Sequence, residues 1–148
     1  MEFKIPLSLN AEHQELHAEL AKAIESGGDT GEAAKAVAEV LHNHFLKEEE
    51  YALPQLGLLP ALADGKVRED MRPAIDMTNK LMADMGQMLQ EHKMVVKALE
   101  HLSEATKREG KQEAVRFSEK LAMHAQTEEE VLYPASILVG EYLKLRLP

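Results

Sequence analysis

The sequence predicts an all-α protein, an antiparallel four-helix bundle with a short C-terminal helical tail. Apolar residues recur at intervals of three and four along four segments, which is the spacing of helices that bury one face. Leu, Ala, Met, Glu and Lys dominate the composition, as expected for helices. Aromatic residues make up only 4% of the 148 residues, which supplies the core of a β-sandwich poorly. The length fits a single domain over residues 1–148.

The first two helices are delimited by capping residues and helix breakers. Asn10 is a suitable N-cap for a helix that runs to Ser26, where two glycines stop it. Asp29 stands three residues before Glu32, which resembles a capping box and opens a second helix. Pro54 ends that helix because proline has no N–H to donate. The inward positions of these helices are Leu9, His13, Leu16, His17, Leu20, Ile24, Val37, Val40, Leu41, His44, Glu48 and Tyr51.

Two further helices follow a connecting segment over residues 55–69, which contains a proline and an Asp-Gly pair. Pro73 suits the start of a long third helix that reaches Arg108. A fourth helix meets Pro134, and the tail over residues 135–148 is expected to form a short helix. The apolar face of this tail can pack internally or join two chains in a homodimer. Short hairpin connections between helices of these lengths favour an antiparallel bundle.

Charge and composition exclude several classes of function. Lys and Arg total 17 against 26 Asp and Glu, a net charge of −9, so binding to nucleic acid is not expected. Cysteine is absent, which excludes thiolate catalysis and Cys-ligated metal sites. No apolar run reaches the ~20 residues that span a bilayer, so no membrane association is expected. The first residues lack a signal-peptide pattern, which makes a cytoplasmic location the default expectation.

Six polar residues stand at inward positions where a bundle core usually has leucine. A buried carboxylate or imidazole without a partner costs several kcal/mol, so six of them in one small core require a common reason. Buried His–Glu pairs that only hold the bundle together rarely stabilise more than apolar residues would. The six are His13, His44, Glu48, His92, His124 and Glu128.

These residues form two copies of one pattern. The segment HFLKEEEYALP at residues 44–54 matches HAQTEEEVLYP at residues 124–134, an offset of 80. His13 matches His92, each preceded by Glu, at an offset of 79. In each HxxxE the two side chains lie one helical turn apart on one face. Two facing hairpins would therefore direct four imidazoles and two carboxylates into one central volume.

This donor set suits a transition metal. Imidazole nitrogen with carboxylate oxygen favours iron, manganese or zinc over calcium or magnesium. Two ions ~3.5–4 Å apart could be bridged by Glu48 and Glu128, with His ligands on either side. The neighbouring glutamates turn away from the axis and are expected to be surface charges or hydrogen-bond acceptors beside the ligands; they are Glu49, Glu50, Glu129 and Glu130. A ferritin-like site is excluded, because it needs two Glu-x-x-His motifs and only one is present.

The ordered set H…HxxxE…H…HxxxE, with its HFxxEE and EEExLYP neighbourhoods, closely resembles the hemerythrin-like (HHE cation-binding) family. The resemblance covers residues 9–134. It implies a centre of two non-haem iron ions with an oxo or hydroxo bridge, which interacts with O2, NO or peroxide. The same six His and Glu residues match the ligand positions of the family.

The chain departs from the oxygen-carrying members of that family at one position. They have a fifth His four residues after the one matched by His92, and Val96 stands there instead. His17, four residues after His13, is a candidate extra ligand or hydrogen-bonding neighbour. Tyr51, three residues after Glu48, could bind iron as a phenolate or donate a hydrogen bond. Open metal positions favour reaction with small oxidants, so a peroxide-scavenging enzyme and iron storage or donation in cluster repair are the alternatives.

Overall fold

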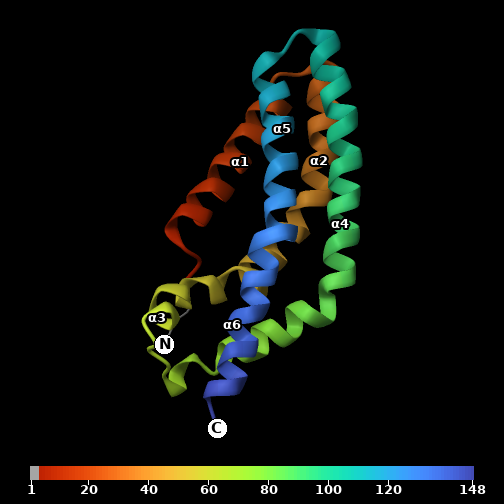
Figure 1. The fold of residues 1–148 in the computed structure, drawn as a ribbon. Coiled ribbons are helices and arrows are strands. Elements are labelled where there is room, and N and C mark those ends of the chain that lie inside the picture. The colour runs from red at the N-terminus through yellow and green to blue at the C-terminus, as the bar shows by residue number, and fades with distance from the viewer. Residues whose placement is uncertain (1–3) are drawn as a thin grey trace.

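The protein is an all-α four-helix bundle, as predicted. The computed structural model describes residues 4–148; residues 1–3, which the single-domain prediction includes, lie outside the described part. Figure 1 shows the long helices running alternately up and down, with two hairpin turns at the same end. The four are α1 (Leu7–Glu25), α2 (Gly28–Lys47), α4 (Pro73–Glu109) and α5 (Gln112–Thr127).

Shorter helical elements close the other end of the bundle. The segment predicted as a connection is largely helical, and Figure 1 shows it folded beneath α1. The predicted C-terminal tail is not separate, because α6 (Tyr133–Arg146) follows the preceding helical turn without a break. The elements of the connection are η2 (Pro54–Leu58), α3 (Leu59–Ala63) and η3 (Glu69–Met71).

A π-helical turn follows each HxxxE motif. The turn η1 (Glu48–Ala52) extends α2, and η4 (Glu128–Leu132) joins α5 to α6. In each turn the backbone N–H of a residue donates to the carbonyl five positions earlier, from Leu53 to Glu48 and from Tyr133 to Glu128. A proline comes next in both copies and cannot donate a helical hydrogen bond. Single π turns inside helices occur frequently at functional sites.

The start of α2 differs from the prediction. Glu32 forms no capping box and pairs instead with Lys35, 3.2 Å away. The cap comes from the far end of α4, where Glu109 accepts hydrogen bonds from the backbone N–H and hydroxyl of Thr30 at 2.8 and 2.6 Å. The N–H of Asp29 also points to Glu109, at 3.3 Å. Sequence spacing within one helix cannot reveal a cap that a different helix supplies.

The remaining boundaries lie close to their predicted positions. The first helix begins at Leu7, so that Asn10 lies inside it and Pro6 precedes it. The long third helix begins at Pro73 as predicted, and Gly110 ends it in a left-handed conformation. Proline fits the first helical turn because its missing N–H would have no helical partner there.

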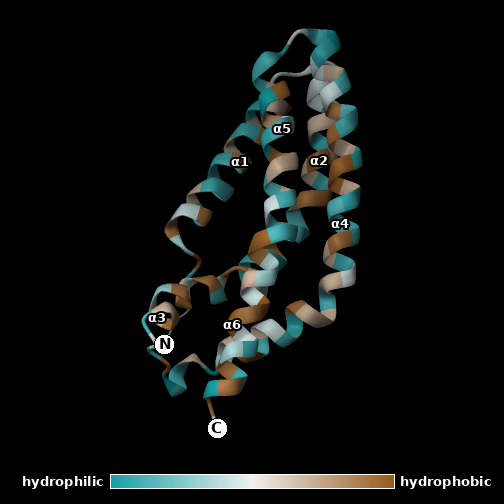
Figure 2. Ribbon diagram, viewed as in Figure 1, coloured by the Kyte–Doolittle hydropathy of each residue, from teal (hydrophilic) through white to brown (hydrophobic). Residues whose placement is uncertain are grey.

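Apolar clusters lie on both sides of the six polar core residues. The larger fills the interior between α1, α2, α4 and α5 and includes Leu16, Phe45 and Leu121. A smaller one, which includes Met88 and Tyr133, lies toward the other end. Figure 2 shows both hydrophobic and hydrophilic residues on every long helix, as expected where one face is buried. Within residues 4–148, no helix has the length and apolar character needed to cross a bilayer.

Candidate metal centre

The six polar core residues predicted as ligands come together in the middle of the bundle. Each has at most 4% of its surface exposed. Two overlapping groups of ligand atoms are close enough to hold a metal ion, and Glu128 belongs to both. The first group is His13, His124 and Glu128, and the second is His44, Glu48, His92 and Glu128.

In the first group, imidazoles from two hairpins face one carboxylate oxygen. Nε2 of His13 and Nε2 of His124 are 3.1 Å apart. Oε2 of Glu128 lies 3.2 Å from His124 Nε2 and 3.7 Å from His13 Nε2. Donor atoms ~2.1 Å from a shared ion lie ~3.0–3.4 Å apart. The two shorter distances fall in that range.

In the second group the other oxygen of the same carboxylate takes part. Oε1 of Glu128 is 3.2 Å from His92 Nε2. Oε1 of Glu48 lies 3.6 Å from His44 Nε2 and 3.9 Å from His13 Nε2. Glu128 therefore presents one oxygen to each group, which is the arrangement of a carboxylate that bridges two cations.

Unpartnered buried oxygens support the binding of a cation. Oε1 of Glu48 and Oε2 of Glu128 are fully enclosed and accept no hydrogen bond from the described residues. Burial and the neighbouring charge of Glu128 raise the pKa of Glu48 well above its usual range. Enclosed oxygens without a donor are costly. A positive ion between the two carboxylates would remove that cost, so the residues present fit a metal ion.

The pKa values of the imidazoles shift in different directions according to their contacts. Burial lowers the pKa of His44. Burial also acts to lower the pKa values of His92 and His124, but the close contacts and charge interactions of both rings with Glu128 raise both above the usual value. Burial acts to raise the pKa of Glu128, yet its contacts with Glu48 and the imidazoles hold it well below its usual range.

A ring of outer carboxylates orients the imidazoles. Three Nδ1 atoms lie at hydrogen-bond distance from a glutamate, and a fourth glutamate, Glu49, lies 3.7 Å from His13 Nδ1. A carboxylate only accepts, so each close pair places the proton on Nδ1 and leaves Nε2 free for the centre. The three close pairs are His44–Glu91 at 2.8 Å, His92–Glu129 at 2.9 Å and His124–Glu12 at 2.5 Å.

The two additional candidates, His17 and Tyr51, are not brought into the cluster. His17 is exposed, and its ring edge lies against Phe45, with the ring centres 4.8 Å apart. Phe45 in turn stacks on His13 at 4.5 Å, so His17 is one side chain removed from the centre. The hydroxyl of Tyr51 donates to Asp84 on α4. Neither residue belongs to the two ligand groups.

The tyrosine that does reach the centre is Tyr133, which sequence reasoning missed. Its hydroxyl donates to Oε2 of Glu48 at 2.7 Å, and only 1% of the residue is exposed. In a regular α-helix, two residues five positions apart lie on different faces. In the π turn, the backbone N–H of Tyr133 donates to the carbonyl of Glu128, which brings these two residues onto the same face. The proline after each EEE segment was the sequence signal for that change of register.

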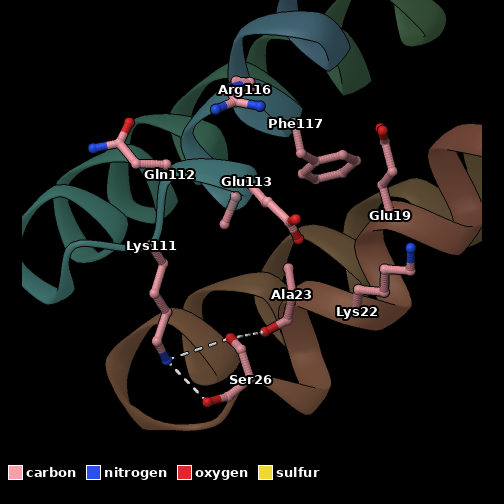
Figure 3. A pocket seen from close by; sticks show the side chains of 10 residues that line it. Glu19, Lys22, Ala23, Ser26, Lys111, Gln112, Glu113, Arg116 and Phe117 are labelled. Carbon is pink, nitrogen blue, oxygen red and sulfur yellow. Dashed lines mark hydrogen bonds between the residues drawn. The ribbon is translucent and has the colours of Figure 1, made fainter.

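A surface cavity lies away from these ligands. It has a volume of about 580 Å³ and opens between the end of α1 and the start of α5, as Figure 3 shows. Lys111 crosses its edge and donates to the backbone oxygens of Ser26 and Gly27 at 2.9 and 3.0 Å. This contact ties the α1–α2 turn to α5. The chemistry-bearing residues are therefore in the closed core of the bundle.

Comparisons with protein-family models, curated proteins and solved structures found no match. The geometry of the site is a buried group of His and Glu side chains that can hold a metal ion.

Proposed function

We propose that this chain is a hemerythrin-like protein with two non-haem iron ions, which binds or senses O2, NO or peroxide. The single observation that carries the proposal is the pair of overlapping ligand groups that share Glu128. One divalent ion would leave half of the donors unused. Two ions use all four imidazoles and both carboxylates.

Each set of residues would have a separate role in this centre. Glu48 and Glu128 would bridge the ions, and the four Nε2 atoms would complete their ligand sets. The outer glutamates would hold the rings of His44, His92 and His124 in place. Iron ions bound here would supply open coordination positions for a small oxidant or a diatomic molecule. The apolar clusters on both sides exclude bulk water from the centre.

Metal content tests this proposal. We expect about two irons per chain after anaerobic loading with Fe²⁺, and a change in near-ultraviolet absorption on exposure to air. His44→Ala and Glu128→Ala should lose iron. His101→Ala is the matched control, because His101 is exposed on α4 away from the cluster. Retention of two irons in both ligand variants, or no iron in the unmodified protein, would refute the proposal.

Reaction with peroxide separates binding from catalysis. A peroxide-scavenging enzyme would turn over many equivalents of peroxide per iron pair, whereas a sensor or binding protein would be oxidised once. Rapid mixing of the reduced protein with excess peroxide measures this directly. Iron storage or donation instead requires transfer of iron to an acceptor protein, which the same loaded protein can be used to test.

A further inference from the structure

Tyr133 makes the two halves of the ligand cluster unequal. Its hydroxyl oxygen lies 3.2 Å from His92 Nε2 and 3.3 Å from His44 Nε2. It also lies 2.7 Å from Glu48 Oε2. The ring stacks on that of His92, with centres 5.6 Å apart. Within residues 4–148, no equivalent hydroxyl contacts the His13–His124 half, because the residue 80 positions before Tyr133 is the buried Leu53.

The hydroxyl of Tyr133 has one proton to donate but lies next to three acceptor atoms. His44 and His92 direct their Nδ1 atoms to Glu91 and Glu129, so both Nε2 atoms carry lone pairs toward the hydroxyl oxygen. Glu48 supplies a third acceptor. A phenol has one O–H and satisfies only one of them. A hydrogen bond to Glu48 therefore explains one contact and leaves two nitrogens facing an oxygen.

A cation satisfies all of these atoms at once. The distances from the hydroxyl oxygen to the two nitrogens, 3.2 and 3.3 Å, fall within the ~3.0–3.4 Å expected between neighbouring ligands of one ion, and the distance to Glu48, 2.7 Å, is that of a hydrogen bond. The hydroxyl oxygen is thus placed as a fellow ligand of His44, His92 and Glu48.

We propose that Tyr133 is a ligand of the metal ion held by His44, His92 and Glu48. The ion in the other half then lacks a phenol oxygen. Binding forms an oxygen–metal bond, breaks the O–H bond and releases that proton to solvent, with no change of oxidation state. This inference rests on the proposed metal centre, and it adds that the two metal positions are chemically different.

The test uses the full chain loaded with Fe³⁺. Coordination by a phenolate should give a visible charge-transfer band and enhanced ring vibrations in resonance Raman spectra, and both should disappear in Tyr133→Phe. Tyr51→Phe is the matched control, since Tyr51 is equally buried but donates to Asp84. Growth on ring-deuterated tyrosine should shift the enhanced vibrations of the unmodified protein, so a poorly folding variant does not prevent the test.

The outcomes separate this inference from the proposed function. Iron-loaded protein without the phenolate band, or with the band intact in Tyr133→Phe, would overturn the role of Tyr133 and leave the metal centre standing. Loss of the band in Tyr51→Phe would overturn it as well. Unmodified protein that takes up no iron would refute the metal centre itself, and the inference with it.

Discussion

Glu91 of α4 fixes the orientation of His44 of α2, with Oε1 2.8 Å from Nδ1. Nζ of Lys47, also on α2, donates to the other oxygen of Glu91 at 2.8 Å, so the position of this carboxylate is fixed as well. The hydrogen bonds of Glu91 lower its pKa despite partial burial, which keeps it charged at neutral pH. A charged acceptor on Nδ1 makes Nε2 a better metal ligand.

Removal of this acceptor should weaken metal binding. We expect Glu91→Ala to lower the affinity for Fe²⁺ or Zn²⁺ by about 10–100-fold, the usual effect of losing a carboxylate behind a His ligand. Competition with a chelating dye measures the change. Glu100→Ala, on the exposed face of the same helix, should bind like the unmodified protein. Equal affinity of the two variants would contradict the role given to Glu91.

Metal removal should destabilise the bundle. Without a cation the enclosed oxygens of Glu48 and Glu128 have no donor, and ligand at ~100 times its dissociation constant adds about 2.7 kcal/mol to the folded state. For a chain of this length that corresponds to a melting temperature ~5–10 °C higher. Thermal unfolding with and without a chelator provides the comparison. An unchanged melting temperature would argue against a built metal site.

Tyr51→Phe should lower the stability of the fold and leave the metal content unchanged. Its hydroxyl donates to Asp84, so its loss should cost about 1–2 kcal/mol of unfolding free energy in the metal-free protein. Urea unfolding measures this, and metal analysis should give the same stoichiometry as the unmodified chain. A drop in metal content would show that Tyr51 acts at the centre after all.

Packing of α6 under α4 depends on a glycine. A Cβ at Gly140 would overlap the side chain of Thr78, so Gly140→Ala should destabilise by about 1–3 kcal/mol. Gly86→Ala is the matched control, because nothing lies within 4 Å of its added Cβ. It should stabilise α4 by about 0.5–1 kcal/mol. Urea unfolding should move the two variants in opposite directions.

The cap that Glu109 places on α2 should make stability depend on pH. Hydrogen bonds from Thr30 lower the pKa of Glu109 from 4.5 to about 2. A lowered pKa means that its contribution is present above pH 4.5 and is lost as the pH falls toward about 2. Glu109→Gln should therefore melt a few degrees lower at neutral pH. The difference should shrink between about pH 4.5 and pH 2, and a difference that grows would reverse the assignment.

Much of the architecture and the predicted ligand set could be read from the sequence. Periodic apolar residues predict the helices. Polar residues at inward positions, such as His13, His44 and Glu128, predict the ligands. The structure brings all six predicted ligand residues into one buried cluster. Their metal and its reaction stay predictions.

The missed features have two physical causes, a contact between distant segments and a local change in the helical turn. Glu109 caps a helix that begins 81 residues earlier, at Gly28, and no local pattern reports this. Tyr133 was missed because counting in α-helical turns selected Tyr51. The π turns alter that count, and the choice between them depends on how the backbone packs ahead of each proline.

The crossed pairs Glu12–His124 and Glu91–His44 make the two hairpins depend on each other for the orientation of these imidazoles. In each pair, one hairpin carries the imidazole and the other carries the carboxylate behind it. Either hairpin alone would leave one of these imidazoles without the carboxylate that lies at hydrogen-bond distance from its Nδ1. Docking of the two hairpins in the correct register is therefore needed to align His44 and His124, which couples the assembly of the bundle to the assembly of the ligand cluster.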